Sequence, residues 1–113
     1  SVKSRGLGDV YKRQVDDELL PTEFALHQNY PNPFNPTTSL RYDLPKDSHV
    51  LITIYDIKGR KVKTLINEFQ NAGYQITQWN ATNEFGQPIS AGMYIYAMQA
   101  GDFRTVKKMI LLK

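Results

Sequence analysis

The most constraining feature of the chain is a regular alternation of apolar and polar residues in short runs. The runs "TTSLRYDL", "VLITIYD" and "MYIYAMQA" each carry an apolar side chain at every second position. A period of two is typical of a β-strand with one buried face. The residues expected to point inward are Leu40, Tyr42 and Leu44, then Val50, Ile52 and Ile54, then Tyr94, Tyr96 and Met98.

Four further runs, "FALHQNY", "RKVKTLIN", "YQITQWN" and "FRTVKKMILLK", are also predicted as strands. Turn signals separate the runs, among them "DIKG", where Gly59 is expected to adopt a positive φ, and "NEFGQPISAG" with Gly86 and Gly92. In "YQITQWN", Ile76 and Trp79 fall on opposite faces, and the pattern does not decide which one points inward. About seven strands with turns roughly every 8–12 residues predict an all-β fold, an antiparallel β-sandwich.

A proline-rich segment, "NYPNPFNP", precedes the first clean strand run. Proline has no N–H to donate to a sheet, so the segment is not a central strand. We expect an extended clasp along one edge of the sandwich, with Tyr30 and Phe34 anchoring it on apolar surface. The prolines would then prevent further strand pairing at that edge.

The net charge of +3 comes from the first 14 residues alone. These carry Lys3, Arg5, Lys12 and Arg13 against Asp9, which is 4 − 1 = +3. The other ten basic residues (14 − 4) balance ten acidic residues (11 − 1). A neutral domain argues against a nucleic-acid partner, which needs clustered Lys and Arg.

The residue types that carry enzyme and metal chemistry are few and scattered. His27 and His49 lie in different predicted strands without a ligand at metal-binding spacing, and cysteine is absent. No serine has a base nearby in the sequence, and the glycines are isolated turn residues rather than a phosphate-binding loop. We therefore predict no catalytic residue, no metal or cofactor site and no small-molecule substrate. No apolar run approaches the ~20 residues of a membrane-spanning helix.

Two features could instead support binding. The aromatic residues Tyr55, Tyr74, Trp79, Tyr94 and Tyr96 could form a platform for carbohydrate, but we favour a place in the sandwich core for them. The last run, "KKMILLK", is continuously apolar between its lysines. It is either a final strand buried on both faces or a tail that another protein reads at the end of the chain.

Five segments in order resemble one protein family: "NYPNPFNPTT", "RYDLP", "VLITIYDIKGRKV", "GYQITQWNATNEFGQPISAGMYIY" and "KKMILLK". Together they resemble the type A C-terminal sorting domain of type IX secretion cargo, which is similar to the immunoglobulin-like domain of the flagellar hook-capping protein. The chain departs from the family at Asn80 and Ala81, where Asp and Gly usually follow Trp79, and at Met93, where Val is common.

The resemblance implies a seven-stranded immunoglobulin-like sandwich over residues 21–113, at the end of a larger secreted protein. Such a domain directs its covalently linked upstream cargo through the outer-membrane translocon, and a sortase-like peptidase then removes it. The product is secreted or displayed at the cell surface, by way of the periplasm and outer membrane of a Gram-negative bacterium.

The resemblance also assigns residues. The translocon would recognise Lys108, Met109, Ile110, Leu111, Leu112 and Lys113, with Asp56 and Gly59. The structural motif comprises Pro31, Asn32, Pro33, Phe34, Asn35, Pro36, Trp79, Gly86, Gly92 and Tyr94. Two alternatives remain open: a structural or adhesive immunoglobulin-like module, and a carbohydrate-binding module, neither with a sorting role.

The head of the chain, residues 1–20, is expected to be a disordered or artefactual segment and linker that packs poorly on the domain. It lacks periodicity and a starting Met, so we expect the chain to be a fragment. Its hexapeptide "DVYKRQ" resembles translated adapter sequence at the ends of assembled environmental DNA.

Overall fold

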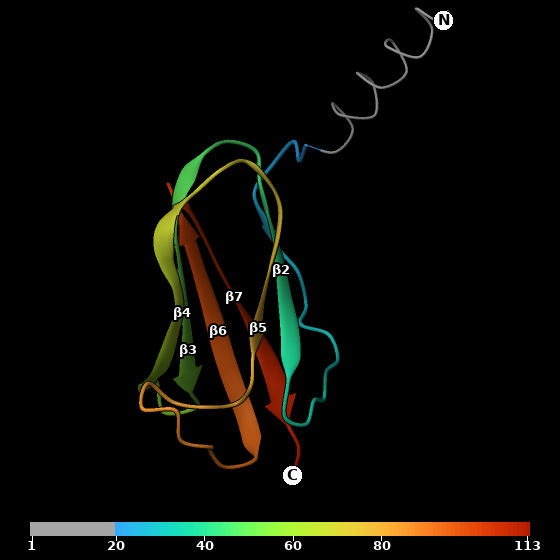
Figure 1. Ribbon diagram of the computed structural model, residues 1–113, viewed down its shortest axis with the longest axis vertical. Coiled ribbons are helices and arrows are strands. Elements are labelled where there is room, and N and C mark those ends of the chain that lie inside the picture. Colours follow the sequence, from blue (N-terminus) through green and yellow to red (C-terminus); the bar gives the residue numbers. More distant parts are fainter. Residues whose placement is uncertain (1–19) are drawn as a thin grey trace, which may run out of the picture.

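The computed structural model describes residues 20–113 (Figure 1). The head expected at residues 1–20 therefore lies, apart from Leu20, outside the described residues. Within residues 20–113 no helix is long and apolar enough to cross a membrane.

Seven strands form two antiparallel sheets, which face each other as two layers in Figure 1. The smaller sheet has the order β1-β2-β5 and the larger one the order β4-β3-β6-β7. The strands are β1 (Ala25–Leu26), β2 (Thr38–Leu44), β3 (Ser48–Asp56), β4 (Lys61–Gln70), β5 (Gly73–Trp79), β6 (Gly92–Ala100) and β7 (Phe103–Leu111). The prediction of an all-β, seven-stranded antiparallel sandwich is confirmed.

The core lies between the two sheets and follows the period of two. Every residue expected to point inward in β2, β3 and β6 is buried. The undecided face of β5 is now clear, because Trp79 is 1% exposed and Ile76 is 61% exposed. Burial of each large apolar side chain contributes roughly 1.5–3 kcal/mol to folding, so this shared face holds the two sheets together.

The first strand is shorter than predicted. We expected it over residues 24–30, but β1 covers only Ala25–Leu26. The pairing with β2 continues through the His27 N–H, which donates to the Arg41 carbonyl at 2.9 Å. It stops at Asn29, whose N–H donates to the Tyr96 hydroxyl, 2.8 Å away, instead of to β2. It resumes only as an isolated bridge between Tyr30 and Ser39.

Two of the turn residues in the left-handed conformation bear on the sequence analysis. Gly59 has a φ of 85°, as the "DIKG" turn predicts. Ala81 has a φ of 61°, at the position where the resembling family has glycine. Ala81 thus keeps the backbone conformation of a glycine turn after Trp79, at the steric cost that a Cβ brings there.

Candidate functional site

The residues that the resemblance assigns to recognition gather at one end of the sandwich. At this end β3 and β7 finish and β6 begins, and the chain terminates (Figure 1). Register places Asp56 beside Tyr94 and Tyr94 beside Met109 across three neighbouring strands. We call this the C-terminal end of the sandwich.

The proline-rich segment lies along the outer edge of β7 at the C-terminal end. The Phe34 N–H donates to the Ile110 carbonyl at 3.0 Å, and the Leu112 N–H donates to the Phe34 carbonyl at 2.8 Å. The Asn32 side-chain oxygen accepts the Ile110 N–H at 2.9 Å, and the Gln28 amide donates to the Lys108 carbonyl at 2.7 Å. These four bonds satisfy backbone groups that an edge strand otherwise leaves open to a further strand.

The side chain of Phe34 is the anchor of this segment. It is 2% exposed, and its ring centroid lies 5.9 Å from that of Trp79. Trp79 in turn packs edge-on against Tyr94 at 5.9 Å. Tyr30 was also expected to anchor the segment, but it is 75% exposed, so that prediction is wrong.

The segment is also bent rather than extended, contrary to expectation. Bends follow one another between Tyr30 and Pro36, and the peptide bonds before Pro31, Pro33 and Pro36 are all cis. The segment meets β7 in strand-like pairing only at Phe34, whose isolated bridge to Leu111 is parallel.

A buried polar cluster fixes the start of the segment. The Tyr96 hydroxyl accepts the Asn29 N–H and donates to the His27 carbonyl, both at 2.8 Å. The Asn29 amide donates to the Thr38 hydroxyl at 3.0 Å, and that hydroxyl donates to the Pro31 carbonyl at 2.8 Å. Burial raises the pKa of Tyr96 to about 12. Asn29 and Thr38 were not singled out in the sequence, because nothing local marks a polar residue that faces a distant tyrosine.

The tail of the chain alternates between the core and solvent. Met109 and Leu111 are buried at 0% and 2% exposure, whereas Ile110 and Leu112 are 40% and 49% exposed. Lys108 and Lys113 are exposed as well. The interpretation of "KKMILLK" as a strand buried on both faces is therefore wrong, because nothing within residues 20–113 covers the outward side of β7 at Ile110.

The Asp56 carboxylate stabilises the turn between β3 and β4. It accepts the backbone N–H groups of Lys58 and Arg60, both at 2.9 Å, and the Arg60 guanidinium at 2.9 Å. The backbone N–H of Arg60 lowers the pKa of Asp56, aided by the Arg60 side chain and Lys58. The same carboxylate adds to the effect of burial in raising the pKa of Tyr94. Asp56 thus acts within its own turn, and the exposed positive groups around it are Lys58 and Arg60.

A small apolar cleft of about 200 Å³ opens beside the end of the chain. Pro36, Ala81, Pro88, Ile89 and Leu112 are among the residues that line it. The loop after β5 is held in place there, since the Trp79 indole donates to the Thr82 carbonyl at 2.9 Å. Gly86 and Gly92 both have a positive φ within or next to this loop.

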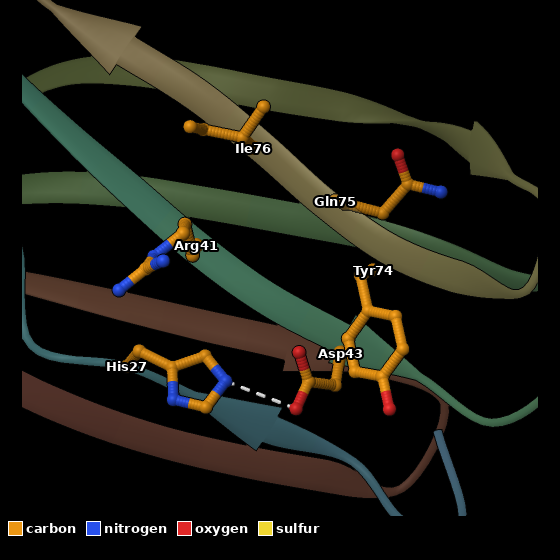
Figure 2. A pocket seen from close by; sticks show the side chains of 6 residues that line it. All are labelled: His27, Arg41, Asp43, Tyr74, Gln75 and Ile76. Atoms are coloured by element: carbon orange, nitrogen blue, oxygen red, sulfur yellow. Dashed lines mark hydrogen bonds and ion pairs between the residues drawn. The ribbon is translucent and has the colours of Figure 1, made fainter. Parts of the chain in front are cut away.

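A second concave surface lies on the outer side of the smaller sheet (Figure 2). It encloses about 440 Å³, and His27 Nε2 lies 2.9 Å from Asp43 Oδ2 within it. Tyr74 stands beside Asp43, and Arg41 lies near His27 (Figure 2). These residues do not join the C-terminal end.

The aromatic residues considered for carbohydrate do not form one platform. Trp79, Tyr94 and Tyr96 belong to the core, as we favoured. Tyr74 is 57% exposed, so the core position that we favoured for it is wrong. Tyr55 is half-buried, and the two tyrosines belong to strands of different sheets. Within residues 20–113, no group of three or more His, Cys, Asp or Glu side chains could hold a metal ion.

Comparison with known proteins identifies the family. The secretion system C-terminal sorting domain family matches residues 28–112. The chain belongs to this family. Its members are C-terminal sorting signals of type IX secretion and are not themselves catalytic. Such a signal implies export to the cell surface, or secretion, in Gram-negative bacteria.

Several solved structures share the fold of this chain. Dimeric latent PorU of Porphyromonas gingivalis is 23% identical, with a TM-score of 0.64, over 80% of this chain and 9% of that chain. PorZ of the same organism, an essential surface component of its type IX secretion system, is 17% identical, with a TM-score of 0.54, over 80% and 11%. FlgD of Xanthomonas campestris, which caps the flagellar hook, is 21% identical, with a TM-score of 0.55, over 86% and 73%. No curated protein matches the chain.

These identities establish the fold and nothing more specific. The chain spans about a tenth of PorU and PorZ. The predicted resemblance to the sorting domain and to the hook-capping protein is confirmed.

Proposed function

We propose that residues 21–113 direct a covalently linked upstream cargo through the type IX outer-membrane translocon and that a sortase-like peptidase then removes them. The route passes through the periplasm of a Gram-negative bacterium. The partners are the translocon and the peptidase, without nucleic acid or a small-molecule substrate. Family membership supports the sorting role, and the geometry of the tail supports the C-terminal end as the surface that is read.

The observation that carries this proposal is the fixed, outward-facing tail. The segment at residues 28–34 covers the backbone edge from Lys108 to Leu112, at the end of β7, with four hydrogen bonds. The side chains of Lys108, Ile110 and Lys113 nevertheless remain exposed. A partner is therefore offered side chains in one defined geometry, while the edge is protected against unwanted strand pairing. A preorganised surface of this kind loses little conformational entropy on binding.

The neighbouring turn adds to this surface. Lys58 and Arg60 are exposed near the Asp56 carboxylate, and the turn depends on Gly59 at a φ of 85°. We include Asp56 and Gly59 in the recognition surface for that reason: Asp56 shapes the turn and Gly59 permits it. The buried motif of Phe34, Trp79 and Tyr94 would act as its support.

The test keeps the strand and changes its charge. A reporter behind an export signal peptide, fused to residues 1–113, is expressed in a type IX-competent bacterium. The double variant Lys108→Gln and Lys113→Gln should fold, since exposed charges contribute only ~0–1 kcal/mol to stability. We expect its fusion to accumulate in the periplasm. The matched control, Lys46→Gln with Arg41→Gln, removes two exposed charges away from the C-terminal end and should be secreted normally.

A second variant tests the access of a partner to the tail. Residues appended after Lys113 would add chain beside the exposed tail and should also cause retention. If this variant and the lysine double variant are both secreted as efficiently as the unaltered fusion, the tail is only a last strand. Failure of the unaltered fusion to leave the cell would contradict the sorting role itself.

A further inference from the structure

The outward side of the larger sheet is apolar at its centre. We call the outward residues of β3, β6 and β7 the outer face. Tyr55, Ile95 and Lys108 form one row across these strands, and Thr53, Ala97 and Val106 form the next. A third row joins Met93 to Ile110. Val106 is 63% exposed, Met93 43% and Ile110 40%, so contiguous apolar surface stays open to solvent.

The centre of the outer face is hollow. A groove of about 240 Å³ lies where Thr53 and Ala97, two short side chains, sit side by side. Larger side chains wall it: Leu51 and Tyr55 come from the neighbouring rows and Val106 from the same row. A flat lipid surface does not fill a hollow of this shape, whereas a projecting side chain of a protein does.

The charged outward side chains of the strands that form the hollow have one sign, and the carboxylate of Glu84 lies beyond them, where it accepts the Thr64 N–H on β4 at 3.0 Å. Arg104 and Lys108 flank it on β7, and Lys61 pairs with Tyr55 from the other side. None of the outward positions of β3, β6 and β7 carries a carboxylate. An apolar centre with a charged rim is the usual anatomy of a protein interface, and a basic rim favours a partner whose own rim is acidic.

We propose that the outer face is a second docking surface, for a protein that presents an apolar projection surrounded by Asp and Glu residues. The inference rests on the proposed sorting function, because the partner is taken to act during secretion. It differs from that function in place, since its centre lies at Ala97 and Val106 rather than at the end of the chain. A sorting domain would then be held on two adjoining surfaces, the tail and the outer face, which share Lys108 and Ile110.

The smaller sheet provides a matched control for the test. Ile76 on β5 is 61% exposed, is also β-branched and also lies on an edge strand. Val106→Glu places a carboxylate in the proposed interface, and Ile76→Glu places one on the opposite layer. Both sites are exposed, so each variant should keep its thermal unfolding midpoint within a few degrees of wild type, about the effect expected of surface changes.

The reporter fusion to residues 1–113 gives the readout. We expect Val106→Glu to lower the released fraction more than about tenfold, because docking would bury an uncompensated charge. Ile76→Glu and the conservative Val106→Ile should be released like wild type. Arg104→Glu should slow release in a pulse-chase experiment, while Arg41→Glu, an equal charge change on the smaller sheet, should not.

Failure of the sorting function and failure of the outer-face inference give different results. If the wild-type fusion is not released, the sorting function fails and this inference falls with it. If the wild type and Val106→Glu are released equally, or if both glutamate variants are retained equally, only the outer-face inference is overturned. Binding of the purified chain to phosphatidylglycerol vesicles but not phosphatidylcholine vesicles, abolished by Val106→Glu, would also overturn it by making lipid the occupant.

Discussion

Removing the Tyr96 hydroxyl tests how much the polar cluster that fixes the proline-rich segment on the larger sheet contributes to stability. Tyr96→Phe keeps the ring, which is fully buried, so packing changes little. The hydroxyl accepts the N–H of Asn29, a residue that is only 2% exposed. That donor would be left without a partner, at a cost of roughly 1–3 kcal/mol. The bond donated to the His27 carbonyl costs less to lose, because His27 is exposed and water can replace it.

The assay is urea unfolding of the wild type, Tyr96→Phe and Tyr30→Phe. Tyr30 is 75% exposed, so its variant should differ from the wild type by less than about 0.5 kcal/mol. For Tyr96→Phe we expect a loss of roughly 1–3 kcal/mol, equivalent to about 4–8 °C in the melting temperature for each kcal/mol. A loss below about 0.5 kcal/mol would show that Asn29 finds another acceptor, and the cluster would then not fix the segment.

The pH dependence of the same pair gives an independent check. Burial raises the pKa of Tyr96 from 10.0 to about 12. A raised pKa means that the folded state holds the proton more tightly than the unfolded state. The resulting contribution of Tyr96 to the free energy of unfolding is therefore complete below about pH 10 and is lost as the pH rises through about 12. The free-energy gap between the wild type and Tyr96→Phe should shrink over that window, and a constant gap would contradict the assignment.

Four further variants test other parts of the fold by the same unfolding assay. Phe34→Ala should cost roughly 3–5 kcal/mol and remove hydrogen-exchange protection of the Leu112 amide; retained protection would mean that the edge is held without Phe34. Ile54→Ala, at a fully buried site, should cost roughly 2–5 kcal/mol. Gly59→Val should cost about 1–2 kcal/mol from backbone strain alone, since no atom lies within 4 Å of an added Cβ; a neutral result would contradict the left-handed turn. Ala81→Gly should change stability by less than about 1 kcal/mol, because relief of strain offsets the lost methyl group and the added chain entropy.

The inward faces of the strands could be predicted because alternation is a local signal. Leu40 and Ile54 can be placed on the inward face from the alternation with their immediate neighbours alone. In β5 the alternation is weak, because Gln75 and Thr77 are polar although half-buried, and only the structure shows that Trp79 points inward. An edge strand needs less apolar surface than a central one, so its sequence carries less information about its faces.

The place of the proline-rich segment could be predicted only in part. The missing N–H groups predict an edge position, and the segment does lie at an edge. Its partner, however, is the far end of the chain, where Phe34 bonds to the backbone of Ile110 and Leu112. No spacing within the sequence encodes a contact between residues that distant, and for the same reason the bond between Asn29 and Tyr96 was missed.

The net charge of the domain does not show how its charged residues are distributed over the fold. Residues 15–113 balance ten basic against ten acidic residues, yet the fold separates many of them. Because successive strands are antiparallel, alternate turns lie at opposite ends of the sandwich. The turn with Lys58 and Arg60 and the tail with Lys108 and Lys113 therefore share the C-terminal end. Acidic residues gather at the other end: Glu23, Asp43, Asp47, Glu68 and Asp102.

This separation could have been derived from the sequence once the strands were assigned, by following which turns fall at which end. The interaction of a charged surface with a partner depends on local charge within a Debye length of about 8–10 Å, not on the total. Neutral composition therefore argues against a uniformly basic domain but leaves room for one basic end. That end is the one at which the tail, the Asp56 turn and the covered edge of β7 meet.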